Sequence, residues 1–235
     1  MSEFENYLNE DILLPNVNGA AYFILLYEWF EDRVISTVKG IYSDPCMLDG
    51  EEYCNIDDEY IKALKKKADN GEDNGVVPYS HLLCEAERKK KQYQQEIIDP
   101  IKGKNAQAFR GSLLWLQKQE AISSEDRARI LQIRLRRNAI VHELLSVLGE
   151  GLSEEDAKMI AELLELNQKI NRWNYIQVDA PIMGYYVPDD TSEINVFGGD
   201  DVILQGMFRI LFMNEGERYK KILEQAKGNE TPEET

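Results

Sequence analysis

The run Arg137-Asn138-Ala139-Ile140-Val141-His142 holds two side chains that can take part in cleaving RNA. A histidine, whose pKa lies near neutrality, can accept the proton of the 2′-hydroxyl or protonate the leaving 5′-oxygen. A guanidinium can hold the non-bridging phosphate oxygens and stabilise the charge of the transition state. RNA carries its own nucleophile, so this chemistry needs no metal ion. The run predicts metal-independent RNA cleavage, with Arg137 on the phosphate and His142 as acid and base.

Asn138 adds to this pattern because it stands four residues before His142. Residues four apart lie on one face of a helix, within hydrogen-bonding reach. An amide in that position can orient the imidazole and select its tautomer. Asn138 is therefore a third candidate catalytic-site residue, in a supporting role.

The helix expected around this run, from about residue 124 to 148, is apolar nearly all round. Such a helix lies at the centre of a bundle or is buried at an interface. On a wheel of about 100° per residue, Leu131, Leu135 and Leu145 share the side of Asn138 and His142, whereas Ile130, Val141 and Leu144 flank Arg137.

The apolar setting makes Arg137 and His142 unusual, because a guanidinium buried without a partner or ligand is costly. Five residues apart on one straight helix, the two side chains do not point the same way. A site forms more easily when two copies bring their motifs together across a two-fold axis. The pattern predicts a homodimer with the site in its cleft. The alternative is a polar network between helices that performs no chemistry.

The formal net charge of −16, from 27 basic and 43 acidic residues, argues against nucleic-acid binding through the overall field. A local cluster of arginines softens that objection, because a basic stripe in an acidic chain can still meet phosphate. From it we predict RNA contacts by Arg129, Arg134 and Arg136. The acidic remainder would equally suit a basic partner protein. Aromatic residues near the end of a later helix are a further candidate for base stacking: Trp173, Tyr175, Tyr185 and Tyr186.

Cysteine and histidine usage predicts no metal or other cofactor. The three cysteines follow no zinc-binding spacing, and the only histidines are His81 and His142. The acidic first residues lack the features of a signal peptide. No apolar run reaches the roughly 18 residues needed to span a bilayer. We therefore expect a cytoplasmic protein with reduced thiols and no membrane contact.

Periodicity and capping signals predict an all-α fold, a helical bundle of about five or six helices with long loop insertions at about 43–75 and 175–198. We expect a single domain over 1–226 and a disordered tail at 227–235. The six main helices are expected at about 18–42, 78–98, 105–121, 124–148, 153–174 and 200–225, and a further short helix is considered at 58–68 within the first insertion.

The run RNAIVHE, with its polar residue after the arginine, resembles the R-x4-6-H motif of the HEPN superfamily. Members are compact helical bundles, frequently dimeric, and many are metal-independent endoribonucleases of toxin–antitoxin, abortive-infection or CRISPR-linked defence systems. The resemblance covers mainly residues 105–174 and the helix at 18–42. It implies that Arg137 and His142 are catalytic and that Asn138 supports them.

Some members also place an acid in the first long helix, and Glu28, Glu31 and Asp32 are the candidates here. Members paired with a nucleotidyltransferase antitoxin often have a tyrosine two residues after the histidine. Leu144 occupies that position, which argues against control by adenylylation there.

The resulting hypothesis is a cytoplasmic endoribonuclease, a hydrolase of toxin or antiviral defence type, with RNA and an antitoxin or defence-system protein as partners. One alternative is a non-catalytic HEPN-like interaction or regulatory protein that binds a basic partner. Another, motivated by the net charge of −16, is a nucleic-acid mimic.

Overall fold

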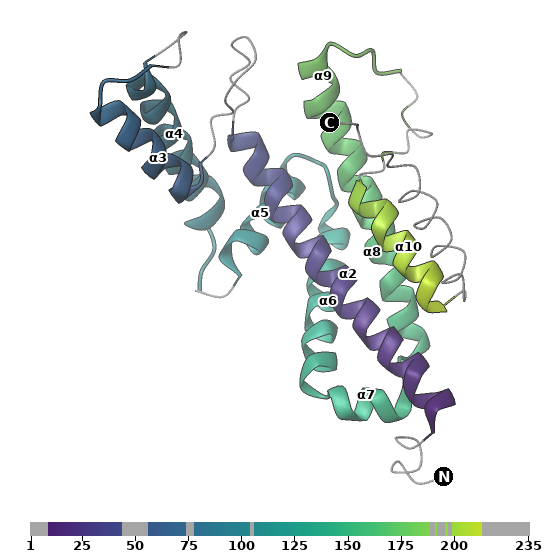
Figure 1. The fold of residues 1–235 in the computed structure, drawn as a ribbon. Helices are drawn as coiled ribbons and strands as arrows, with labels where there is room; N and C mark the ends of the chain where they lie inside the picture. The colour runs from purple at the N-terminus through teal and green to yellow at the C-terminus, as the bar shows by residue number, and fades with distance from the viewer. Residues whose placement is uncertain are drawn as a thin grey trace, which may run out of the picture. The chain divides into compact units, whose positions relative to one another are not determined.

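The computed structural model describes residues 9–43, 56–73, 78–103, 106–188, 191, 196 and 199–212. All regular elements in these ranges are helices, and the one β-bridge, between Asp73 and Pro78, is isolated. The all-α prediction is confirmed (Figure 1). The predicted tail at 227–235 lies outside the described residues.

The helical segments follow one another along the chain. In chain order they are α2 (Glu10–Tyr42), α3 (Asp58–Asp69), α4 (Tyr79–Tyr93), the π-helix η1 (Gln94–Ile98), α5 (Gln107–Lys118), α6 (Ser124–His142), α7 (Leu144–Glu150), α8 (Glu154–Asn174), the π-helix η2 (Tyr175–Asp179), α9 (Ala180–Met183) and α10 (Gly199–Phe212).

The chain folds as two compact units. Of the described residues, the first unit contains those within Met1–Glu28, Ile130–Asn171 and Glu193–Thr235, and the second contains those within Trp29–Arg129 and Arg172–Ser192. Helices α2, α6 and α8 each continue from one unit into the other. The motif run belongs to the first unit.

The core of the first unit follows from helical periodicity. Apolar side chains recur at steps of three and four residues and are buried. The aromatic rings of Tyr22 on α2 and Phe208 on α10 lie 5.5 Å apart. On α10, the buried carboxylate of Asp201 accepts hydrogen bonds from the buried amides of Asn167 and Asn171 of α8 (2.7 and 3.3 Å). These bonds satisfy a carboxylate that would otherwise be costly to bury.

Helices α6 and α8 begin with the same capping arrangement, as their Ser-x-x-Asp sequences predict. The backbone N–H of Asp126 donates to the Ser123 hydroxyl (3.0 Å), and the Ser123 N–H donates to the Asp126 carboxylate (2.8 Å). Ser153 and Asp156 repeat both bonds at 3.2 and 2.8 Å. Each cap satisfies two backbone donors that the first helical turn leaves unpaired.

Asp156 also ties α8 to α6. Its carboxylate is 1% exposed and accepts hydrogen bonds from the Arg136 Nε and Nη2 atoms, at 2.6 and 2.8 Å. Burial alone would raise the pKa of Asp156, but the bonds from Arg136 and Ser153 and the charge of Arg136 lower the pKa to about 2. The bidentate pair therefore holds two helices of the first unit together.

Gly151 stands at the end of α7, where a glycine commonly ends a helix. Gly151 caps α7 with a φ of +85°, a conformation that L side chains rarely adopt. A Cβ atom there would stand 2.8 Å from the Asn16 Oδ1 atom. The Asn16 amide donates to the Leu148 carbonyl (2.9 Å), so the glycine lets α2 approach the end of α7.

The second unit has its own helix pairs. Leu64 of α3 packs with Tyr79, Leu82 and Ala86 of α4. A Cβ atom at Gly111 of α5 would lie 1.9 Å from a carbonyl oxygen of η1, so only glycine permits this approach.

Three helix boundaries differ from the sequence-based expectation. The first long helix begins at Glu10 rather than near residue 18, with Pro15 inside it. The motif helix does not continue to residue 148, because Glu143 leaves the helical conformation (φ −107°, ψ 26°) and the chain turns sharply into α7 (Figure 1). The expected loop at 175–198 instead starts as helix, since η2 and α9 extend α8 to Met183. The described part of the chain thus holds more helical segments than the predicted five or six.

The Asp156→Asn substitution should reduce the free energy of unfolding by about 2 kcal/mol at neutral pH. The pKa of Asp156 in the folded protein lies below its ordinary value of 3.8. The contribution of the Asp156 carboxylate to the free energy of unfolding is therefore fully present above pH 3.8 and is lost as the pH falls through about 2. In the parent protein, the free energy of unfolding measured with urea should show this loss between pH 6 and pH 2. The Asp156→Asn variant should lack that component, whereas Glu165→Gln, at an exposed position of α8, should retain it. Equal pH dependence in all three proteins would contradict the assignment.

Candidate functional site

Arg137 is held in place by two neighbouring helical segments of the first unit. Its Nη2 atom forms an ion pair with the carboxylate of Glu28 on α2, and its Nη1 atom donates to the Asn138 Oδ1 atom (2.9 Å). The guanidinium carbon lies 5.8 Å from the centre of the Tyr27 ring, a cation–π distance. With 26% of its side chain exposed, Arg137 is anchored but still reaches the surface.

The Nε atom of Arg137 is buried and has no hydrogen-bond partner within the described ranges. Such a donor carries a desolvation cost. The apolar sequence around Arg137 predicted a guanidinium that needs partners, and the structure supplies them on its two terminal nitrogens only.

Of the three acids that the sequence left open, the structure pairs Glu28 with Arg137. Glu28 follows directly after Tyr27, whose ring is buried, so the same turn of α2 supplies the carboxylate and the aromatic face. The Glu28 side chain is 48% exposed, and ion pairs at such positions contribute about 0–1 kcal/mol. A stronger anion can therefore compete for Arg137.

Asn138 has a different observed partner from the one the sequence suggested. Its amide oxygen accepts from Arg137, and within the described part of the chain no hydrogen bond joins it to the His142 imidazole. The arrangement lets Asn138 fix the guanidinium. Its predicted role in orienting His142 remains a prediction.

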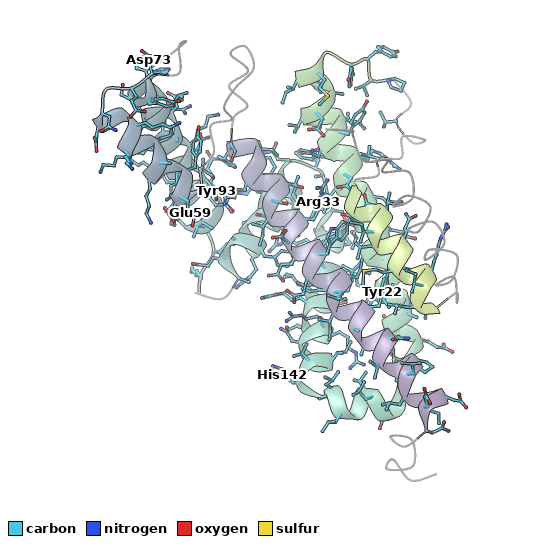
Figure 2. All side chains as sticks on the ribbon, in the orientation of Figure 1. Tyr22, Arg33, Glu59, Asp73, Tyr93 and His142 are labelled. Atoms are coloured by element: carbon cyan, nitrogen blue, oxygen red, sulfur yellow. The ribbon has the colours of Figure 1, made fainter. Side chains whose placement is uncertain are left out.

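His142 is the last residue of α6 and is exposed, at the corner where the chain turns into α7 (Figure 2). Its apolar neighbours are exposed as well: Leu135 is 69% exposed, Leu145 is 74% exposed, and Val141 and Leu144 are partly so. A helix that is apolar nearly all round is covered either by the core of a bundle or by an interface. Because His142 and its apolar neighbours are exposed, an interface is favoured here.

Four residues of α6 share one side of the helix and form what we call the α6 seam. Their spacing of four, three and four residues is the heptad pattern with which helices pair. Leu135 and His142 are exposed, and the other two residues are partly buried. The α6 seam consists of Leu131, Leu135, Asn138 and His142.

The three arginines predicted to contact RNA lie in different surroundings. Arg136 donates from its Nε and Nη2 atoms to the buried carboxylate of Asp156, so these two atoms are engaged within the fold. Arg134 lies in the first unit and Arg129 in the second, and each is partly exposed. RNA contact by Arg129, Arg134 and Arg136 stays a prediction.

Sequence reasoning missed the aromatic face of Tyr27 and the partner of Arg136. The sequence predicts only the position of Asp156 in its helix, because a Ser-x-x-Asp cap places its aspartate at the third helical residue. The pairing with Arg136 depends on how α6 and α8 pack, which no local signal encodes.

No family model matches the chain, and comparisons with curated proteins and with solved structures find no match. Within the described ranges, no group of three or more His, Cys, Asp and Glu side chains is placed to hold a metal ion. In the same ranges, no helix has both the length and the apolar character required to cross a membrane.

A double-mutant cycle on Glu28→Gln and Arg137→Gln should give a coupling free energy of about 0.2–1 kcal/mol in urea unfolding. The ion pair is partly exposed, so added salt should reduce the coupling. A matched cycle that replaces Glu28→Gln by Glu165→Gln should give no coupling. A coupling of zero for the Glu28 cycle would mean that the ion pair does not hold Arg137 in solution.

Proposed function

We propose that the protein is a metal-independent endoribonuclease of HEPN type that acts as a homodimer. The observation that carries this proposal is the exposed His142 on the α6 seam, five residues after an arginine that is anchored but open to the surface. Dimerisation through the seam would cover its leucines and bring two copies of His142 toward one another.

The proposed reaction uses the nucleophile of the substrate. One His142 accepts the proton of the 2′-hydroxyl, whose oxygen attacks the phosphorus, and the bond from phosphorus to the 5′-oxygen breaks. The histidine of the other copy protonates that leaving oxygen. The products are a 2′,3′-cyclic phosphate and a 5′-hydroxyl end. Arg137 stabilises the phosphorane charge through its fixed guanidinium.

In this proposal the Glu28 carboxylate occupies the phosphate-binding position on Arg137 when RNA is absent. A phosphate approaching Arg137 has to displace the carboxylate from the Nη2 atom. The pair is partly exposed and weak enough for this exchange. Asn138 and the Tyr27 ring keep the guanidinium in place while its partner changes.

The resemblance to HEPN proteins also suggests a setting. We propose a toxin or antiviral defence role in the cytoplasm, with an antitoxin or another defence protein as partner.

A non-catalytic interaction protein is the second candidate, and the partners of Arg137 within the fold favour it. Glu28 and Asn138 occupy both terminal nitrogens, as they would in a purely structural network. The net charge of −16 would then serve a basic partner. The two candidates differ in whether the purified protein cleaves RNA.

The protein should cleave structured RNA in the presence of EDTA, leaving 2′,3′-cyclic phosphate ends. Arg137→Ala and His142→Ala should each lower the cleavage rate by at least about 100-fold, as loss of an acid–base or charge-stabilising group does. His81→Ala, which removes the only other histidine, should retain full activity and controls for the general effect of replacing a histidine. Unchanged cleavage by the Arg137 and His142 variants would refute the proposal, and absence of cleavage in every preparation would favour the interaction protein.

Leu135→Glu should convert the dimer to a monomer in sedimentation velocity and abolish RNA cleavage, because it places a charge at the centre of the α6 seam. Circular dichroism should show unchanged helix content, since Leu135 is exposed. Val202→Glu, at an exposed apolar position of α10 outside the seam, should remain dimeric and active. A parent protein that is monomeric at the concentrations where it cleaves RNA would contradict the dimer.

A further inference from the structure

A cavity in the second unit is lined by aromatic, amide and acidic side chains that have no role in the proposed nuclease reaction. It measures about 560 Å³, within the range of small-ligand sites. Its lining comes from the end of α2, the end of α5, the last turn of α8 and the π-helix η2. The residues that matter below are Trp115, Gln119, Glu120, Trp173 and Gln177.

Two tryptophans form a corner of the cavity. The ring centres of Trp115 and Trp173 are 5.9 Å apart, and the ring planes are nearly perpendicular (86°). Both side chains are partly exposed. Indole faces carry partial negative charge and attract cations more strongly than other aromatic rings do. The corner therefore lines the cavity with two indole rings set at nearly a right angle, and Trp115 also packs against the ring of Tyr42 (6.3 Å between ring centres).

Glu120 is the only charged residue among the described residues that line the cavity, and its backbone adopts an unusual conformation. It follows the C-cap of α5 with a φ of +60°. Its N–H donates to the Gln117 carbonyl (3.1 Å), and the N–H of Ala121 donates to the Leu116 carbonyl (2.9 Å). This is the Schellman pattern, in which glycine is the favoured residue. A glutamate here costs backbone strain, and residues under such strain cluster at functional sites.

The π-helix η2 brings a further polar group to the cavity. Gln177 lies within η2, which interrupts regular helix between α8 and α9, and Gln119 is the C-cap of α5. Single-turn π-helices occur frequently at functional sites. Gln119, Gln177 and Glu120 all line the cavity, and their amide and carboxylate oxygens are acceptors that suit a donor-rich cation.

We propose that this cavity binds the cationic side chain, arginine or lysine, of a basic partner protein. Two indole rings, one carboxylate and two amides line it, and this chemistry matches a guanidinium or ammonium group. The net charge of −16 would attract such a partner at long range. A nucleobase would also stack on indole, but the lining within the described ranges contains no cation to receive its phosphate. The inference is independent of the proposed nuclease.

The test is isothermal titration of the full-length protein with the acetylated peptide Gly-Arg-Gly-Arg-Gly amide at physiological salt. Glu120→Gly should weaken binding about tenfold. Because glycine relieves the positive φ, the same substitution should leave Tm unchanged or raise it by about 2 °C. Trp173→Leu should weaken binding about threefold or more. Glu87→Gln, which removes one exposed acid on α4 outside the cavity, should bind like the parent protein.

Three outcomes would overturn the proposal. Equal binding by the Glu120→Gly, Trp173→Leu and parent proteins would mean that the peptide binds the acidic surface in general. Binding of tetramethylammonium as tight as that of the peptide would indicate a small-molecule cation site. Preferential binding of adenosine monophosphate, lost in Trp173→Leu, would assign the cavity to a nucleotide.

Discussion

Two adjacent arginines on α6 organise the first unit. Arg136 binds the buried Asp156 of α8, and Arg137 pairs with Glu28 of α2. Consecutive helical residues point about 100° apart, so one turn of α6 is joined to two other helices in two directions. The Asp156 pair is buried and bidentate and resists exchange, whereas the Glu28 pair is half-exposed. Arg136 therefore forms a stable ion pair with α8, whereas Arg137 forms an exchangeable ion pair with α2.

This arrangement separates the rigid part of the candidate site from its open part. Arg137 is fixed by Glu28, Asn138 and the Tyr27 ring. His142, roughly 7.5 Å further along the helix axis at 1.5 Å per residue, stands where α6 ends and has no such support among the described residues. A fixed charge and an exposed imidazole become one site only if something covers the α6 seam. The proposed second copy is one way to meet that requirement.

Local signals predicted much of the fold. The caps Ser123–Asp126 and Ser153–Asp156 mark the starts of α6 and α8. Gly151 lies just after the expected end of the motif helix near residue 148, and in the structure it ends the separate helix α7. The break at Glu143 was not predictable, because Glu143 is flanked by helix-forming and apolar residues. The choice of Glu28 among three nearby acids also depends on tertiary packing. A helical wheel showed that α6 is apolar all round but could not say whether a core or an interface would cover it.

The charges of the described structure set different conditions for the two proposed ligands. RNA would meet a chain of charge −16, and at Arg137 its phosphate would have to displace a carboxylate. Net repulsion and this exchange both weaken binding to a single copy, so recognition has to rely on a small number of well-placed contacts. A cation entering the cavity beside Trp115 and Trp173 would be attracted by the whole chain and would find Glu120 at the wall. The electrostatics of this protein thus favour a basic partner over long distances and leave any selectivity for RNA to the immediate surroundings of α6.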